Sequence, residues 1–215
     1  EYLLPQVKVK ILQKSFSRTQ KEGLKAMKKN SLIKITTALT VGLSLITAGT
    51  AFSGTGAGTE ENPYQVTECS ELDEVREDKT AYYQLQNNIN CGGNTFTSIN
   101  DFSGTFNGSG YEIQNFRIEE PSQDSVGVFG HVTGGTVVKT GIREAEVEGS
   151  QYVGTLIGEL SNGLLADSYV VNSSVSGDDE VGGLIGLMRG GDPLMTGSYA
   201  INTSASGPSD VGGLI

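Results

Sequence analysis

Short apolar segments that contain glycines return at nearly regular intervals along the second half of the chain. The segment V-G-G-L-I-G at residues 181–186 has counterparts starting at Val126, Val153 and Val211, so the starts are 27, 28 and 30 residues apart. A period in this range predicts a solenoid, a propeller or an array. The repeat-marker residues are Val126, Gly127, Val153, Gly154, Val181, Gly182, Gly183, Leu184, Val211, Gly212, Gly213 and Leu214.

The residues between the markers also repeat, since residues 168–185 and 198–215 are identical at 11 of 18 positions. One unit holds too few large apolar side chains for a core of its own, whereas stacked units bury a continuous one. The pattern predicts an all-β, right-handed β-solenoid over residues 102–215 that continues beyond 215. Val171, Val181 and Leu184 are expected to point inward, and the glycines to allow tight corners with positive φ. Antiparallel propeller blades, which are usually longer, are the alternative.

Residues 62–101 have a different pattern, which predicts an N-terminal cap. Ser70, followed by Asp73 three positions later, is typical of a helix start with Ser70 as the N-cap. Apolar residues then alternate at Tyr83, Leu85, Ile89 and Cys91, as in a strand.

Cys69 and Cys91 are the only cysteines and flank this predicted helix and strand. We predict a disulfide between them, which would stabilise the fold by roughly 3 kcal/mol in the chain-entropy model. A metal site with two thiolates is the alternative, but zinc usually takes four ligands.

The first 61 residues contain features of export. Met27 is followed by Lys28 and Lys29, an apolar run over residues 35–48 and small residues at 49–51, so residues 27–52 are predicted as a signal peptide. Residues 1–26 are then upstream sequence outside the native protein, and residues 53–61 are a flexible linker. A membrane anchor with a long basic leader is the alternative, although the apolar run is shorter than the about 20 residues of a spanning helix. No transmembrane span is expected in the mature part.

Charge is divided unevenly along the chain. After Lys34 there are 6 basic and 23 acidic residues, a net charge of about −17. Nucleic-acid binding is therefore not expected, because phosphate contacts need clustered Lys and Arg. We hypothesise a high-salt habitat, where salt shortens the Debye length to roughly 3 Å at 1 M. An ordinary acidic extracellular protein is the alternative.

The marker V-G-G-L-I-G, followed by Ser-Tyr-x-x-Asn and a later Ser-Gly, resembles the GLUG-motif repeat of bacterial and archaeal surface proteins. Adhesins of the filamentous-haemagglutinin kind and some secreted IgA peptidases carry it. The segment G-T-F-N-G-S-G-Y-E-I-Q-N-F resembles the one that precedes such repeats. This resemblance covers residues 62–215 and implies a right-handed β-helix on an exported protein, without catalytic residues to transfer.

Few residues suggest chemistry. Glu144, Glu146 and Glu148 alternate along one strand, so they could bind Ca²⁺ or act on a polysaccharide, but a solvated face is the preferred explanation. The acidic turn at residues 178–180 lacks a calcium-loop spacing, and His131 belongs to no metal motif and is expected at a surface or corner. We therefore predict no catalytic, metal or cofactor residue.

Tyr169 and Tyr199 lie 30 residues apart and should stack between coils, as core aromatics or as a ligand platform. Asn107, Asn172 and Asn202 each begin an N-x-S/T sequon and are candidate glycosylation sites. Hydrogen-bonded stacks of Asn side chains are the alternative explanation.

Together these patterns predict an exported, cell-surface or extracellular protein with a structural or adhesive role and no catalysis in this segment. Its partner would be a surface protein or a glycan that the sequence does not identify, with cations at the acidic surface as further ligands. The alternative is a non-catalytic repeat module of a larger secreted polysaccharide-active enzyme or peptidase.

Overall fold

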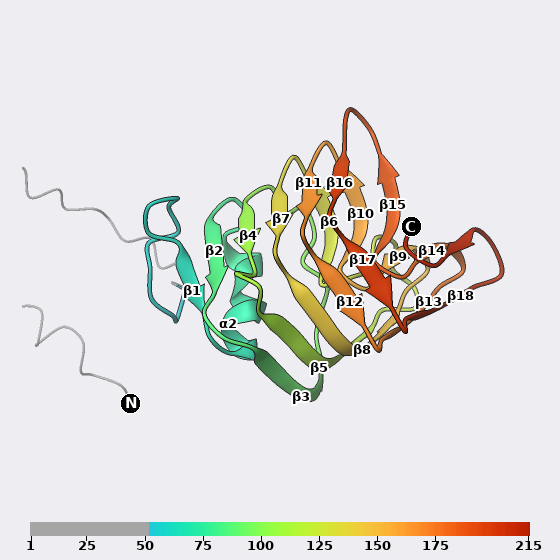
Figure 1. The fold of residues 1–215 in the computed structure, drawn as a ribbon, viewed down its shortest axis with the longest axis horizontal. Helices are drawn as coiled ribbons and strands as arrows, with labels where there is room; N and C mark the ends of the chain where they lie inside the picture. The colour runs from blue at the N-terminus through green and yellow to red at the C-terminus, as the bar shows by residue number, and fades with distance from the viewer. Residues whose placement is uncertain (1–51) are drawn as a thin grey trace, which may run out of the picture. The chain divides into compact units, whose positions relative to one another are not determined.

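The computed structural model describes residues 52–215. They form a nearly all-β solenoid of about four turns with one short helical segment, as the sequence predicts (Figure 1). The predicted upstream sequence, the cleavage site and all of the predicted signal peptide except Phe52 lie outside the described residues.

Every pairing between the named strands is parallel, and equivalent strands of successive coils lie side by side in four sheets. The first sheet holds β1 (Tyr64–Val66), β2 (Tyr82–Leu85), β4 (Thr105–Asn107), β7 (Thr136–Val138), β11 (Leu164–Ala166) and β16 (Leu194–Thr196). The second holds β3 (Ile89–Thr95), β5 (Glu112–Glu119), β8 (Gly141–Glu148), β12 (Tyr169–Val171), β13 (Ser174–Ser176), β17 (Tyr199–Ile201) and β18 (Ser204–Ser206). The third holds β6 (Phe129–Thr133), β10 (Ile157–Ser161) and β15 (Ile185–Arg189), and the fourth β9 (Gln151–Gly154), β14 (Asp179–Gly182) and β19 (Val211–Gly212).

Strand pairing extends into the segment predicted as a cap. β1 pairs with β2, and β2 pairs with β4, so the stack begins at Tyr64 and not at residue 102. Within the predicted linker, Thr55 forms an antiparallel bridge with Gln65. The predicted boundaries at residues 61 and 101 are therefore not breaks in the pairing.

The helical segment consists of α2 (Cys69–Asp73) and η2 (Glu74–Glu77) between β1 and β2. Its N-cap is Glu68, so the prediction of Ser70 as the cap is wrong. The Glu71 carboxylate accepts the Glu68 N–H at 3.3 Å, which completes a capping box two residues earlier than the Ser-x-x-Asp pattern suggests.

The repeat markers stack in register. Val126 pairs with Val153, Val153 with Val181, and Val181 with Val211. Phe129 pairs with Ile157. One residue separates Val126-Gly127 from Phe129, whereas two residues separate Val153-Gly154 from Ile157, so the first marker is one residue shorter. That missing residue accounts for the spacing of 27 in place of 28.

The marker glycines do not adopt positive φ, so that expectation is wrong for them. A Cβ on Gly154 or Gly182 would instead collide with the carbonyl oxygen of Ile157 or Ile185, because the backbone turns back closely on itself there. Left-handed φ falls on glycines elsewhere in the chain, among them Gly134, Gly190 and Gly197, and on residues with side chains, which stack at the corners of successive coils. One such corner consists of Asn115, Glu144, Asn172 and Asn202, with φ between 49° and 55°.

The core lies between the sheets and follows the coil axis. Val181 and Leu184 are fully buried as predicted, but Val171 is half-buried and points outward. Its neighbour Val170 is the buried residue of β12. In a strand a shift of one residue exchanges the faces, and the adjacent Val-Val pair does not reveal which side chain is inside.

Repeated serines explain part of the regular spacing of the coils. The Ser168 hydroxyl accepts the Thr140 N–H of the preceding coil at 3.1 Å and donates to the Ala166 carbonyl at 2.9 Å. Ser198 repeats both bonds one coil later with Ser168 and Thr196. These hydroxyls satisfy backbone groups at a corner where strand pairing is interrupted.

Candidate functional site

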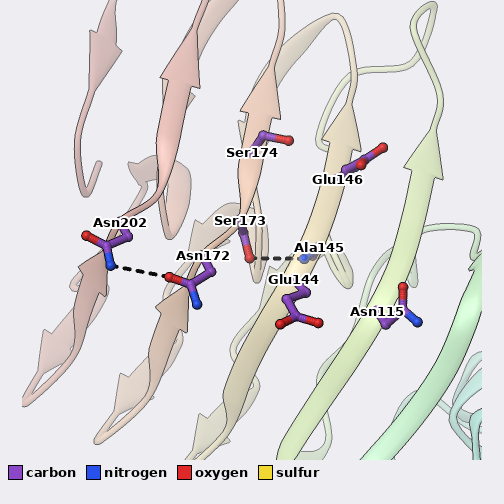
Figure 2. A pocket seen from close by; sticks show the side chains of 8 residues that line it. All are labelled: Asn115, Glu144, Ala145, Glu146, Asn172, Ser173, Ser174 and Asn202. Atoms are coloured by element: carbon purple, nitrogen blue, oxygen red, sulfur yellow. Dashed lines mark hydrogen bonds between the residues drawn. The ribbon is translucent and has the colours of Figure 1, made fainter.

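An open groove follows the left-handed corner of the second sheet (Figure 2). It has a volume of about 500 Å³ and is lined by side chains from β5, β8 and the coils that contain β13 and β18. Asn202 Nδ2 donates to Asn172 Oδ1 at 3.3 Å across the two coils (Figure 2). The lining residues are Asn115, Glu144, Ala145, Glu146, Asn172, Ser173, Ser174 and Asn202.

The three alternating glutamates are all exposed, in agreement with a solvated face. Glu144 occupies the left-handed corner, whereas Glu146 and Glu148 project from the straight part of β8. Glu146 pairs with Arg117 at 3.1 Å, where both side chains are at least half exposed. In the part of the chain that the structure describes, no group of three His, Cys, Asp or Glu residues could hold a metal ion.

The three sequons differ in their surroundings. Asn172 and Asn202 are exposed at the corner of the groove. Asn107 is half-buried in β4, between β2 and β7, and its Oδ1 accepts the Ser109 N–H at 2.9 Å. The predicted Asn stack thus exists between Asn172 and Asn202, and Asn107 has no place in it.

A second polar cluster is centred on Glu112, which is 9% exposed at the start of β5. Arg143 of the next coil donates to both carboxylate oxygens, at 2.9 and 2.7 Å, and Tyr169 of the following coil donates its hydroxyl at 2.9 Å. Mainly because of Arg143, and against the effect of burial, the pKa of Glu112 is lowered to about 2. The cluster ties three coils together with charge-assisted hydrogen bonds.

Gly141 is what allows this contact. A Cβ at Gly141 would lie 2.6 Å from Tyr169 Cζ, so the tyrosine ring crosses β8 where that strand has no side chain. Burial, and then the Glu112 carboxylate, raise the pKa of the Tyr169 hydroxyl to about 12. The hydroxyl therefore remains a donor at physiological pH.

Tyr169 and Tyr199 stack as predicted, with ring centroids 5.4 Å apart and planes 8° from parallel. They lie on the outside of the solenoid, since Tyr199 is 46% exposed, so the prediction of core aromatics is wrong. Because the rings face each other along the stack, the inner face of each is occupied by its neighbour. This arrangement does not present a flat two-ring platform to a ligand.

The third sheet has an ion-pair ladder that sequence reasoning missed. Arg189 donates to both oxygens of Glu159, at 2.7 and 3.0 Å. His131 lies between the carboxylates of Glu159 and Asp101, at 3.4 and 3.2 Å. These four side chains come from successive coils. His131 and Glu159 are paired in register, 28 residues apart, whereas Arg189 lies two residues beyond Leu187, the partner of Glu159. The near-periodic spacing of charged residues was the signal in the sequence that could have indicated the ladder.

Glu159 is only 3% exposed. Burial has the largest single effect and would raise its pKa, but the hydrogen bonds from Arg189 and Ser161 and the nearby His131 together lower it. Arg189 also lies over the Tyr152 ring, 5.2 Å from its centroid. The Glu159 carboxylate is thus paired with groups of the neighbouring coils, and removal of Arg189 would leave a buried charge unpaired.

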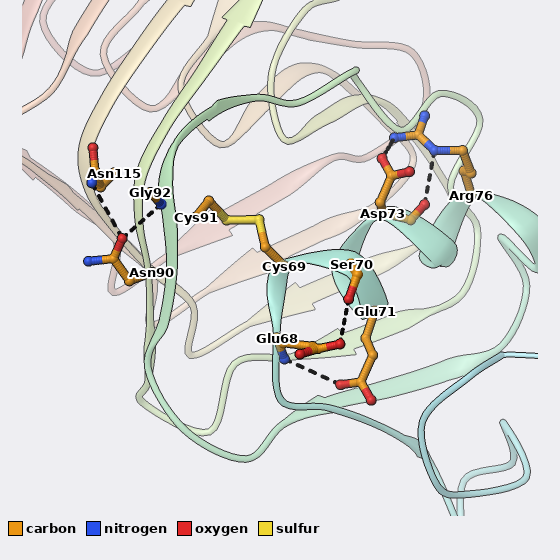
Figure 3. The surroundings of a disulfide bond; sticks show 10 residues. All are labelled: Glu68, Cys69, Ser70, Glu71, Asp73, Arg76, Asn90, Cys91, Gly92 and Asn115. Atoms are coloured by element: carbon orange, nitrogen blue, oxygen red, sulfur yellow. Dashed lines mark hydrogen bonds and ion pairs between the residues drawn. A yellow bond between two sulfur atoms is a disulfide. The ribbon is translucent and has the colours of Figure 1, made fainter.

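The disulfide between Cys69 and Cys91 is confirmed (Figure 3). It joins the first residue of α2 to β3, with the Cα atoms 5.4 Å apart. Residues 52–215 contain no helix long and apolar enough to cross a membrane.

Comparisons with known proteins give partial matches. No family model matches the chain. Halomucin from Haloquadratum walsbyi is 34% identical over 136 residues, and a protein described as a Gly-rich membrane protein from Evansella cellulosilytica is 35% identical over 91 residues. The matches cover 54% and 37% of this chain but only 2% and 10% of those proteins.

Among solved structures, a protein described as an immunoglobulin A1 protease from Bacteroides ovatus is similar at 17% identity and a TM-score of 0.38. That match covers 74% of this chain and 62% of the other. Since no family model matches, the resemblance to GLUG-motif proteins remains a prediction.

Proposed function

We propose that this solenoid acts at the cell surface as a structural element whose lateral face makes adhesive contacts. The observation that carries the proposal is the outer face of β5, β8 and β13, where successive coils present an open polar groove beside exposed carboxylates. A face that extends over successive coils suits weak contacts that add through multivalency.

Location at the surface is supported by two further observations. Disulfides persist in oxidising compartments, and the Cys69–Cys91 bond is present. The partial relatives are halomucin, from a halophile, and a protein described as a membrane protein. A structural role also agrees with the two polar clusters centred on Glu112 and Glu159, because the hydrogen bonds of both clusters connect neighbouring coils.

The rival proposal is a repeat module of a larger secreted enzyme. In both polar clusters an arginine donates hydrogen bonds to the carboxylate. Neither cluster places a nucleophile next to a base within reach of the groove. The face therefore supports contact better than chemistry, and any catalysis would belong to another segment.

Adhesion can be tested by changing the charge of the lateral face in producing cells. The double variant Glu146→Lys with Glu148→Lys should reduce attachment of these cells to one another or to a surface by several fold. The control is Thr136→Lys on β7, in a different sheet, which should attach as the unmodified protein does. If removing the whole gene leaves attachment unchanged, the adhesive role is wrong, and release of sugars or peptides by the purified protein would favour the enzyme module.

A further inference from the structure

In the sequons of the last two coils, each of the three residues has a different role in the fold. Asn172 occupies the left-handed corner, a conformation that Asn tolerates better than most residues. Ser173 points inward, where its hydroxyl accepts the Ala145 N–H at 3.1 Å and donates to the Val171 carbonyl at 3.1 Å. The fold therefore explains the first two residues of this sequon without a glycan.

The third residue is different, because the fold does not require it to be serine. Ser174 is an exposed outward residue of β13, and the residues at the same level of the preceding coils are Glu146 and Arg117. Any polar side chain serves there. Both of the last coils have a serine at this position, Ser174 and Ser204. These serines supply the hydroxyl that N-glycosylation requires two residues after Asn.

The corner also leaves room for a sugar. Asn172, Asn202 and Ser174 line the open groove of about 500 Å³. The bond from Asn202 Nδ2 to Asn172 Oδ1 uses one of the two amide hydrogens. A sugar on Nδ2 replaces the other hydrogen, so this bond and the glycan are compatible.

The sequon at Asn107 is bound into the fold. Asn107 Oδ1 accepts the Ser109 N–H at 2.9 Å, and the Ser109 hydroxyl accepts from Gln84 Nε2 at 3.0 Å. Between them, Gly108 lies against the backbone of Lys139 and Thr140 in the next coil. Neither the acceptor nor the hydroxyl stands clear of neighbouring coils.

We propose that Asn172 and Asn202 carry N-linked glycans and that Asn107 does not. The new bond joins Asn Nδ2 to the anomeric carbon of an oligosaccharide, the bond that breaks joins this carbon to the phosphate of a lipid-linked donor, and the displaced amide proton leaves with that phosphate. The inference rests on the proposed surface location, because such modification acts on exported chains.

Peptide mapping by mass spectrometry tests the proposed glycosylation. The protein is taken from producing cells, and its cytosolic and surface fractions are analysed separately. Glycopeptides are expected at Asn172 and Asn202 and an unmodified peptide at Asn107. Ser174→Ala should abolish the glycan at Asn172 alone. Ser176→Ala, a change on the same strand outside any sequon, should leave it in place.

Surface-fraction protein with Asn172 or Asn202 unmodified, or with Asn107 modified, would overturn the inference while leaving the proposed function intact. Protein found unmodified and only in the cytosol would overturn both.

Discussion

Thr155 shows how the repeat tolerates a locally unfavourable residue. It takes the place in the second marker that Gly183 has in the third, and it is fully buried. Its hydroxyl is a buried side-chain group with no hydrogen-bond partner among the described residues. A buried, unpaired polar group of this kind costs free energy that an apolar group of the same shape does not.

We predict that Thr155→Val raises the free energy of unfolding by about 1 kcal/mol. The matched control is Thr140→Val, because Thr140 is equally buried but its hydroxyl donates to the Val138 carbonyl at 3.0 Å. In the control, the free energy of unfolding should fall by about 1 kcal/mol. Denaturant unfolding of both variants measures the difference, and a loss of stability in Thr155→Val would contradict the assignment.

Glu112 predicts a pH dependence. Its folded-state pKa is lowered from 4.5 to about 2, so its contribution is fully present above pH 4.5 and is lost as the pH falls toward 2. The shift corresponds to at most about 3 kcal/mol. Glu112→Gln should therefore be clearly less stable than the unmodified protein at pH 6, and the gap should close near pH 2.

Glu146→Gln is the control for this series, since its ion pair with Arg117 is exposed and should contribute little at any pH. A gap for Glu112→Gln that stays constant from pH 6 to pH 2 would rule out the carboxylate as its origin.

The repeat pattern located the marker glycines correctly, but the structure gives them a different role from the expected one. The marker glycines were expected to adopt positive φ, but they serve close approach of the backbone, while other glycines and residues with side chains such as Asn172 and Glu144 occupy the left-handed positions. Composition does not separate these two uses of glycine, because both lie beside apolar residues. Glu112 and Arg143, 31 residues apart, went unnoticed because one residue of the pair precedes the first marker.

At the scale of the element, the fold could be predicted because every coil repeats the same apolar positions. The disulfide followed from the presence of only two cysteines, on either side of the predicted helix and strand, and the stacking of Tyr169 on Tyr199 followed from their spacing. The inward face of β12 did not, because Val170 and Val171 are chemically alike and only the register decides between them. The start of the stack at Tyr64 was also missed, since β1 and β2 carry no marker.

Leu184→Ala should lower the free energy of unfolding by about 2–5 kcal/mol, because this side chain is fully buried in the core. Val171→Ala is the matched control on an outward position and should change it by less than about 0.5 kcal/mol. Thermal or denaturant unfolding gives both values. Equal losses for the two variants would mean that the inner and outer faces are wrongly assigned.

At the scale of the whole molecule, charge is the dominant property outside the core. The chain after Lys34 carries about 17 net negative charges, and most of its few cations are used in ion pairs between coils or within the helical segment. Salt screens the remaining repulsion, with a Debye length of roughly 3 Å at 1 M. We therefore expect the melting temperature to rise by several degrees from low salt to 1 M salt, and equal melting temperatures would refute the high-salt hypothesis.

The central claim is that this solenoid is displayed at the cell surface, and labelling of intact cells tests it most directly. Antibodies against residues 102–215 should give equal signals on intact and on permeabilised producing cells, with a cytosolic protein as the control that is labelled only after permeabilisation. A signal that appears only after permeabilisation would contradict the claim.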